Sequence, residues 1–166
     1  MIVFLIGFMG SGKTTVGKKL AKKLKFEFID LDSLIEQNEK STVTEIFEKK
    51  GEAFFREIEH KTLISLFSKK QVAISCGGGT PCFFDAINLM NEVGKTIYLK
   101  MSSEAIFSRL YHAKVKRPLI NNMNDDELRN FITSKLEERE PIYAKAKIIC
   151  NALNFKLSDI ESVLKP

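Results

Sequence analysis

An apolar segment, a glycine-rich turn and an amphipathic helical pattern follow one another at the start of the chain, and this succession constrains the fold most. Residues 2–6 read IVFLI, residues 7–14 read GFMGSGKT, and a helical pattern extends over Lys13–Leu24. A Gly-x(4)-Gly-Lys-Thr turn between a strand and a helix is typical of a loop whose main-chain N–H groups bind phosphates. The helix N-terminus adds further donors and the positive end of its dipole. This start therefore predicts a nucleotide phosphate site after the first strand of a parallel α/β sheet.

Each residue type in this loop has a role in binding ATP. The glycines let the main chain approach the phosphates, Lys13 can reach the β- and γ-phosphates, and the Thr14 hydroxyl can ligate magnesium. Thr15 lies one step further into the helix and either contacts phosphate or only caps. A glycine-rich turn that binds no nucleotide is the alternative. The residues predicted to bind ATP here are Gly10, Ser11, Gly12, Lys13, Thr14 and Thr15.

The rest of the chain alternates short β-branched or aromatic segments with longer helical patterns. This alternation predicts a single α/β domain over residues 1–166, with a five-stranded parallel sheet covered by helices on both faces, the three-layer P-loop NTPase fold. The predicted strands are Ile2–Ile6, Glu27–Asp30, Val72–Ser75, Thr96–Lys100 and Ile148–Cys150. The predicted helices are Lys13–Leu24, Asp32–Glu39, Val43–Lys50, Glu52–Phe67, Phe84–Asn91, Glu104–Leu110, Asp125–Ala146 and Leu157–Leu164.

Composition narrows the possible partners and compartment. No apolar run is long enough to span a bilayer, and residues 1–6 lack the basic start and cleavage site of a signal peptide, so we expect a soluble cytoplasmic protein. Three cysteines without a C-x-x-C pair fit a reducing compartment and no structural zinc. The net charge of +5 raises nucleic-acid binding as a hypothesis, but the basic residues occur as short pairs without interleaved aromatics. We interpret them as solvated helix faces.

Two aspartates at the end of the second predicted strand are candidates for chemistry. Asp30 and Asp32 are two residues apart, which on a strand directs both carboxylates to the same side. One can orient the magnesium shell while the other accepts a hydroxyl proton, as phosphoryl transfer requires. In the alternative interpretation, Asp32 merely caps the helix over residues 33–39 and Asp30 is a solvated strand end.

Other candidates face the same edge of the sheet. Arg56 and Glu59 are three residues apart on a predicted helix, where Glu59 can hold the Arg56 guanidinium so that it binds a carboxylate. Gly77-Gly78-Gly79 follow the third strand, which indicates close approach of a ligand to the main chain. The polar segment 111–124 predicts a lid, from which Arg117 can fold over the triphosphate, and Arg139 can point to the same cleft. A surface ion pair, a plain loop and solvated arginines are the alternatives.

The loop by itself leaves kinases, GTPases, motors and transport ATPases open. The chain has no Asn-Lys-x-Asp motif for reading guanine, and it is short for a motor or a transporter subunit. Two other hypotheses remain at this point: a kinase acting on gluconate or a nucleotide, and a binding or regulatory module that has lost turnover.

Taken together, the motifs resemble those of the shikimate kinases, over nearly the whole chain. The matching stretches are IGFMGSGKTTVGKKLAKKL, the Asp30-x-Asp32 pair, TEIFEKKGEAFFREIE, the three glycines, Arg117-Pro118-Leu119 and Arg139-x-Pro-Ile-Tyr143. The resemblance implies a sheet of strand order 2-3-1-4-5, a substrate-binding segment over 32–60, a mobile lid over 111–124 and a monomer. It also implies phosphorylation of the 3-hydroxyl of shikimate by ATP with Mg²⁺, in the shikimate pathway of aromatic amino acid biosynthesis.

The resemblance further implies a role for each matching residue. Asp32 would bind the acceptor hydroxyl as the base, and Asp30 would hold magnesium through water. Arg56 and Arg139 would bind the carboxylate of shikimate beside the main chain of Gly78 and Gly79. Arg117 would reach ATP from the lid, and Arg109 is the candidate for the residue that stacks on adenine.

Overall fold

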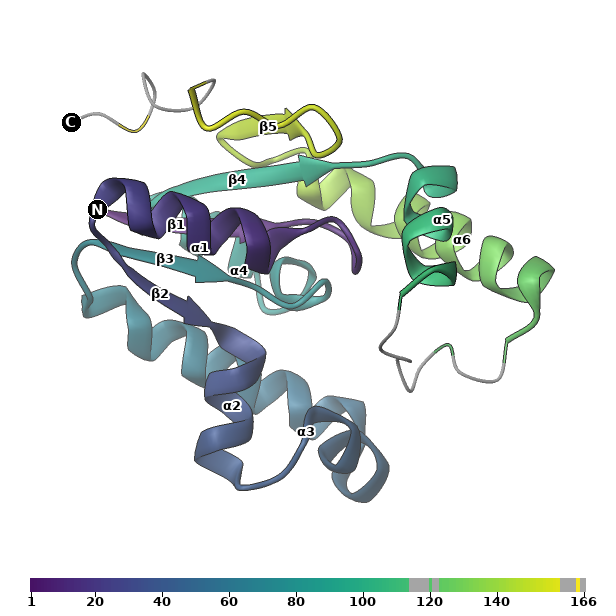
Figure 1. Cartoon of the computed structure of the whole chain (residues 1–166). Helices are drawn as coiled ribbons and strands as arrows, with labels where there is room; N and C mark the ends of the chain where they lie inside the picture. Colours follow the sequence, from purple (N-terminus) through teal and green to yellow (C-terminus); the bar gives the residue numbers. More distant parts are fainter. Residues whose placement is uncertain (114–119, 121–122, 159–163, 165–166) are drawn as a thin grey trace.

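The computed structural model describes residues 1–113, 120, 123–158 and 164, and its centre is a five-stranded parallel sheet (Figure 1). The strand order is β2-β3-β1-β4-β5, and every neighbouring pair is parallel. This confirms the predicted fold class and strand order. The strands are β1 (Ile2–Ile6), β2 (Glu27–Asp30), β3 (Val72–Ser75), β4 (Lys95–Lys100) and β5 (Ile148–Asn151).

The central strands are buried on both faces, which explains their continuous apolar sequences. All five residues of β1 and all four of β3 are buried, whereas the edge strands β2 and β5 are partly exposed. Successive side chains of a strand point to opposite faces. Phe4 and Ile6 accordingly join one apolar cluster, and Val3 and Leu5 join another. The sheet is therefore the middle of three layers.

The helices divide between the two faces. Helix α1 (Lys13–Leu24) packs on one face, in the same cluster as Leu164. The opposite face is covered by α2 (Leu31–Glu39), α3 (Val43–Ser65), α4 (Ala86–Val93) and the end of α6 (Asp125–Tyr143). Helix α5 (Ser103–Tyr111) packs on α6 in a third cluster, which also contains Phe8. Two short 3₁₀ helices, η1 (Leu66–Ser68) and η2 (Thr80–Cys82), complete the described elements. In Figure 1, α2 and α3 project on one side of the strand ends, and α5 and α6 on the other.

Several boundaries differ from the prediction for local reasons. The predicted helices Val43–Lys50 and Glu52–Phe67 form the single element α3, but Gly51 has φ 84° and ψ 169° and separates two helical parts. Helix α4 begins at Ala86 instead of Phe84, since Phe84 and Asp85 have left-handed backbone conformations with φ 52° and 56°. Helix α6 ends at Tyr143, not at Ala146. Most of the predicted lid 111–124 and of the predicted helix 157–164 lies outside the described residues.

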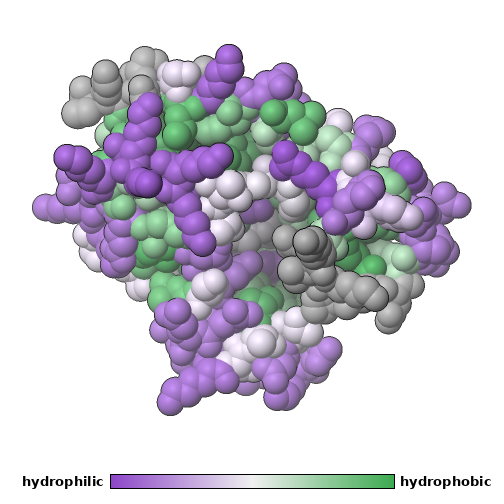
Figure 2. All heavy atoms as spheres, in the orientation of Figure 1, coloured by the Kyte–Doolittle hydropathy of each residue, from purple (hydrophilic) through white to green (hydrophobic). Residues whose placement is uncertain are grey.

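The surface over α1 is hydrophilic (Figure 2). Its paired lysines Lys18, Lys19, Lys22 and Lys23 are all exposed, as a solvated helix face requires. Within the described ranges, no helix combines the length and the apolar character needed to cross a membrane.

Candidate active site

The phosphate-binding loop is built by three glycines in positive φ. Gly7, Gly10 and Gly12 have φ of 140°, 80° and 94°, values that residues with a Cβ rarely adopt. The Lys13 ammonium donates to the carbonyl oxygens of Gly7 and Phe8, at 3.0 Å each. The loop therefore curls around its own lysine, whose charge lies where phosphate oxygens would bind.

Ser11 and Thr15 occupy contrasting positions around this loop. Ser11 Oγ is one of two buried side-chain polar atoms that lack a hydrogen-bond partner among the described residues. An orphaned hydroxyl within the loop is a free partner for a bound phosphate. Thr15 is exposed in the first turn of α1.

Three oxygen-bearing side chains meet at the start of α1. Thr14 Oγ1 donates to Asp30 Oδ2 at 2.9 Å and lies 3.4 Å from Ser75 Oγ. Hydroxyl and carboxylate oxygens are the ligands that Mg²⁺ prefers, usually with water and substrate phosphates completing the shell. No described group of three or more His, Cys, Asp or Glu side chains could hold a metal by itself. Thr14 and Asp30 thus fit a magnesium ion that arrives with its nucleotide.

The two aspartates differ from the strand-based prediction in their local structure. Helix α2 starts at Leu31, and Asp30 is its N-cap, with Oδ1 accepting from the Ser33 N–H at 3.4 Å. Asp32 therefore lies in the first turn of the helix and not on a strand beside Asp30. Capping falls to Asp30, the reverse of the alternative in which Asp32 would cap. Asp32 nevertheless faces the glycine turn after β3, because a Cβ on Gly77 would lie 3.0 Å from Asp32 Oδ1.

Asp32 is a carboxyl group whose pKa is raised to about 6. Burial is the main cause, followed by the nearby negative charges of Glu59 and Asp30, while Lys13 acts in the opposite direction. A carboxylate with its pKa near neutrality can accept a proton in a transition state more readily than an ordinary aspartate.

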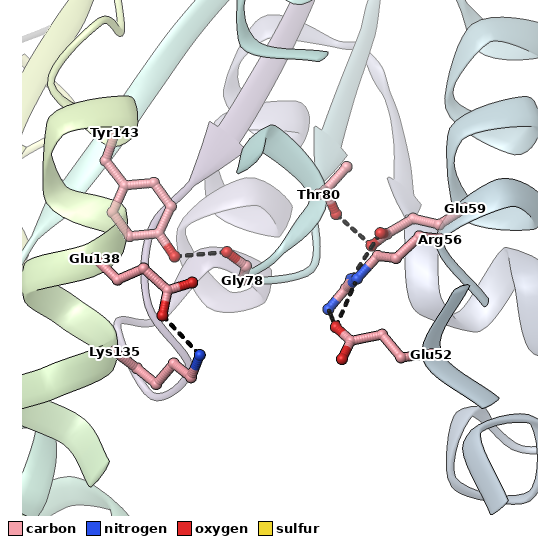
Figure 3. Close-up of polar contacts among 8 residues, drawn as sticks. All are labelled: Glu52, Arg56, Glu59, Gly78, Thr80, Lys135, Glu138 and Tyr143. Atoms are coloured by element: carbon pink, nitrogen blue, oxygen red, sulfur yellow. Dashed lines mark hydrogen bonds and ion pairs between the residues drawn. The ribbon is translucent and has the colours of Figure 1, made fainter. Parts of the chain in front are cut away.

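Arg56 is held in place by carboxylates on two sides (Figure 3). Its Nη1 donates to Glu59 Oε2 at 2.8 Å, and its Nε and Nη2 donate to Glu52 Oε1 at 3.2 and 3.0 Å. The Arg56 and Glu59 side chains are 10% and 3% exposed, whereas Glu52 is 58% exposed. Burial alone lowers the pKa of Arg56, but the two carboxylates outweigh it and raise that pKa above its ordinary value. The guanidinium thus has one buried partner, Glu59, and one solvent-exposed partner, Glu52.

The three glycines after β3 lie against these charged groups. A Cβ on Gly79 would lie 2.5 Å from Arg56 Nη2, and a Cβ on Gly78 would lie 3.4 Å from Arg139 Nη1. A Cβ on Gly77 would lie 3.0 Å from both Asp32 Oδ1 and Glu59 Oε1. This turn requires glycine because side chains of the site approach its main chain closely.

A cavity of about 440 Å³ collects these groups. Asp32, Arg56, Gly78, Gly79 and Arg139 all line it, so the structure brings together the residues predicted to bind the acceptor. The wall also contains groups that sequence reasoning missed. These are the carboxylates Glu36 and Glu48 and the apolar side chains Met9, Val43, Phe47, Phe55 and Phe131. In the sequence, such aromatic residues on helices are indistinguishable from core residues.

The chemistry of the cavity follows from its lining. Two guanidinium groups can bind an anion, and a carboxylate of raised pKa lies among several other carboxylates. Apolar side chains from α3 and α6 enclose the remaining volume. Met9 brings the phosphate-binding loop into the same wall. The cavity is thus suited to a small acid that carries hydroxyl groups, next to a phosphate donor.

Of the remaining predicted residues, the structure describes Arg109, which lies on the nucleotide side. Arg109 on α5 is exposed, and its Nη1 donates to the Gly10 carbonyl at 3.1 Å, so it lies over the phosphate-binding loop. Arg117, predicted to reach ATP from the lid, lies outside the described residues.

Comparisons with known proteins agree on one family. The family model for shikimate kinase matches residues 9–164. A curated shikimate kinase of Bacteroides thetaiotaomicron is 47% identical over 150 residues, covering 90% of this chain and 86% of that protein. Another, from Azobacteroides pseudotrichonymphae, is 44% identical over 165 residues, covering 99% of this chain and 97% of that protein.

Solved structures support the same assignment. The crystal structure of shikimate kinase from Bacteroides thetaiotaomicron superposes with a TM-score of 0.90 at 45% identity, covering 98% of this chain and 93% of that chain. A shikimate kinase from Acinetobacter baumannii, solved in complex with shikimate, gives a TM-score of 0.83 at 32% identity, covering 99% of this chain and 95% of that chain. A gluconokinase from Sinorhizobium meliloti shares the fold at a TM-score of 0.54 and 18% identity. With a family model that spans almost the whole sequence and relatives this similar, the chain belongs to the shikimate kinase family.

Proposed function

We propose that this protein transfers the γ-phosphoryl group of ATP to the 3-hydroxyl of shikimate, giving shikimate 3-phosphate and ADP. The observation that carries the proposal is one cavity, beside the phosphate-binding loop, that contains Asp32, Arg56 and Arg139. Shikimate is a small hydroxylated carboxylic acid, which matches two guanidinium groups and a proton-accepting carboxylate. The shikimate complex of the Acinetobacter baumannii relative supports the choice of acceptor.

Arg56 and Arg139 bind the carboxylate of the acceptor in this mechanism. Glu59 is buried and holds Nη1 of Arg56, whereas Glu52 is largely exposed and occupies Nε and Nη2. The carboxylate of shikimate replaces Glu52 at Nε and Nη2 of Arg56, since a guanidinium binds a carboxylate best through two parallel hydrogen bonds. The backbone of Gly78 and Gly79 completes the acceptor site.

Asp32 and Lys13 act on the reacting groups. The Asp32 carboxylate binds the 3-hydroxyl and accepts its proton as the new bond to phosphorus forms. Lys13 leaves the carbonyls of Gly7 and Phe8 and neutralises charge on the β- and γ-phosphates. Positioning and electrostatic stabilisation account for most of the rate in this reaction class.

The remaining roles are on the nucleotide side. Main-chain N–H groups and hydroxyls of residues 10–15 bind the phosphates, Arg109 lies against the adenine, and Arg117 comes from the lid over 111–124. Thr14 and Asp30, the latter through water, would hold Mg²⁺, which neutralises phosphate charge when bound. We further propose that the chain is one P-loop kinase domain over 1–166, with residues 32–60 as the substrate-binding segment. It acts in the cytoplasm as a monomer, without nucleic-acid or membrane partners, in aromatic amino acid biosynthesis.

The decisive experiment measures ADP release with and without shikimate, and in parallel with gluconate and nucleoside monophosphates. Of these acceptors, we expect only shikimate to support ADP release. In Lys13→Ala we expect kcat to fall by at least about 100-fold. ADP release with gluconate or a nucleoside monophosphate in place of shikimate would assign a different acceptor. ATP binding without any acceptor-dependent ADP release would instead indicate a binding or regulatory module.

A further inference from the structure

The hydroxyl of Tyr143 connects the protein core to the glycine turn of the cavity. Tyr143 ends α6, is 0% exposed and does not line the cavity. Its hydroxyl donates to the Gly78 carbonyl oxygen at 2.5 Å, across 65 positions of sequence. Figure 3 shows this carbonyl pointing toward α6 and away from Arg56. A buried hydroxyl thus holds one peptide group of the acceptor site from behind.

This contact also fixes the direction of the next N–H group. In a planar trans peptide, the carbonyl of Gly78 and the N–H of Gly79 point in opposite directions. With the carbonyl held by Tyr143, the Gly79 N–H must point to the side of the turn where Arg56 lies. No hydrogen bond among the described residues uses that N–H, so it is available to a ligand. A peptide between two glycines would otherwise rotate at little cost, because both residues lack a Cβ.

Arg139 connects the same tyrosine to the anion-binding groups. It lies one helical turn before Tyr143, which places both side chains on one face of α6. Burial raises the pKa of the Tyr143 hydroxyl, and the neighbouring Arg139 charge acts in the opposite direction. Tyr143 is therefore next to both the main chain and one of the two guanidinium groups of the acceptor site.

The end of α6 is itself anchored independently of this hydroxyl. Glu140 accepts from the Tyr98 hydroxyl at 2.5 Å and forms an ion pair with Lys100 at 2.6 Å. The rings of Tyr98 and Tyr143 pack with their centroids 5.1 Å apart. The Lys100–Glu140 ion pair and the packing of the two rings do not depend on either hydroxyl, so each hydroxyl can be removed without releasing α6.

We propose that Tyr143 is a positioning residue for the acceptor, whose hydroxyl orients the Gly78–Gly79 peptide so that the Gly79 N–H faces the bound acid. The inference rests on the proposed function, since it assumes that the acceptor occupies this cavity. Tyr143 does not touch the reacting atoms, so its effect belongs to acceptor binding and not to the phosphoryl-transfer step.

The test compares Tyr143→Phe with Tyr98→Phe. Each change removes one hydroxyl that donates a hydrogen bond of 2.5 Å, from Tyr143 to the Gly78 carbonyl or from Tyr98 to Glu140. The two variants are well matched because the two rings pack against each other. For Tyr143→Phe we expect the KM and the calorimetric Kd for shikimate to rise about five- to twentyfold. The KM for ATP should stay within about twofold, and kcat within about threefold. For Tyr98→Phe we expect all of these constants within about twofold of wild type.

Every other result would overturn the inference or the function on which it rests. An unchanged KM for shikimate in Tyr143→Phe, an equal rise in the KM for ATP, or the same shift in Tyr98→Phe would contradict a positioning role. A Tyr143→Phe protein that does not fold would also contradict it, because the hydroxyl would then be a structural group of the core. If wild type itself neither bound nor phosphorylated shikimate, the proposed function would fail instead.

Discussion

The Arg56 guanidinium is a charge inside the protein that the structure tolerates because carboxylates pair with it. Removing the whole side chain would leave the buried Glu59 carboxylate without its cationic partner, with only the Thr80 hydroxyl, among the described residues, still donating to it, and losing one member of a buried ion pair costs about 3–5 kcal/mol. Arg56→Ala therefore mixes loss of binding with loss of stability. A lysine keeps the charge beside Glu59 but lacks the two-pronged geometry that binds a carboxylate.

Arg56→Lys is the cleaner test of carboxylate binding. We expect the KM for shikimate to rise by at least about tenfold, because one bidentate contact is lost, while the KM for ATP stays within about twofold. Steady-state kinetics with each substrate varied in turn measures both constants. Arg129→Lys is the matched control, since Arg129 lies on α6 over the Phe107 ring and does not line the cavity. Unchanged shikimate affinity in Arg56→Lys would show that another group binds the acid.

Gly79→Ala tests the close approach of the main chain to the same guanidinium. Gly79 has φ −87° and ψ −21°, a conformation that alanine adopts without strain. Its new Cβ would lie 2.5 Å from Arg56 Nη2, so the guanidinium must move. We expect the KM for shikimate to rise by about tenfold or more, as measured in the same kinetic assay. A variant with wild-type KM would mean that the guanidinium position is not important for acceptor binding.

At the scale of secondary-structure elements, local patterns predicted most of the fold. Three of the five strands have the predicted bounds, and β4 and β5 are each one residue longer than predicted. The strands were predictable because each one is a short segment rich in β-branched or aromatic residues. The phosphate-binding loop was predictable since its chemistry needs a contiguous sequence. The contact between Tyr143 and Gly78 was not, because it joins residues 65 positions apart through tertiary packing. The same holds for Phe47 and Phe131, which share one cavity wall although they come from different helices.

Gly51 divides α3 into two parts, and a substitution at this break tests whether the backbone of α3 helps to position Arg56. Its φ of 84° and ψ of 169° lie in a region that is essentially restricted to glycine, although a Cβ at this position would meet no atom within 4 Å. The cost of Gly51→Ala is thus backbone strain alone, about 1–3 kcal/mol. We expect a lower midpoint in urea denaturation, together with weaker shikimate binding, because Glu52 follows the break directly and Arg56 lies one helical turn after Glu52. Full stability in Gly51→Ala would show that this backbone conformation is not required.

At the scale of the whole molecule, the cavity is a place where function opposes stability. The protein carries a net charge of +5, yet among the described residues four carboxylates and two arginines line one cavity, the carboxylates being those of Asp32, Glu36, Glu48 and Glu59. Like charges that are close together and partly removed from water raise the free energy of the folded state. The raised pKa of Asp32 reports this cost, since the folded protein holds a proton on that carboxyl more tightly than the unfolded chain does.

Asp32→Asn should therefore make the protein more stable and nearly inactive. The pKa of Asp32 rises from 3.8 to about 6 on folding, so its stabilising contribution is complete below pH about 4 and lost as the pH rises through 6. At pH 7.5 we expect urea denaturation to show a gain of roughly 2–3 kcal/mol in the variant, shrinking by about half at pH 5. The kcat should fall about 10²- to 10⁴-fold. In wild type, kcat/KM for shikimate should decline below pH 6, as this carboxylate becomes protonated. Equal stability of the two proteins at pH 7.5 would mean that Asp32 carries no electrostatic cost, and its proposed role as the base would lose its physical support.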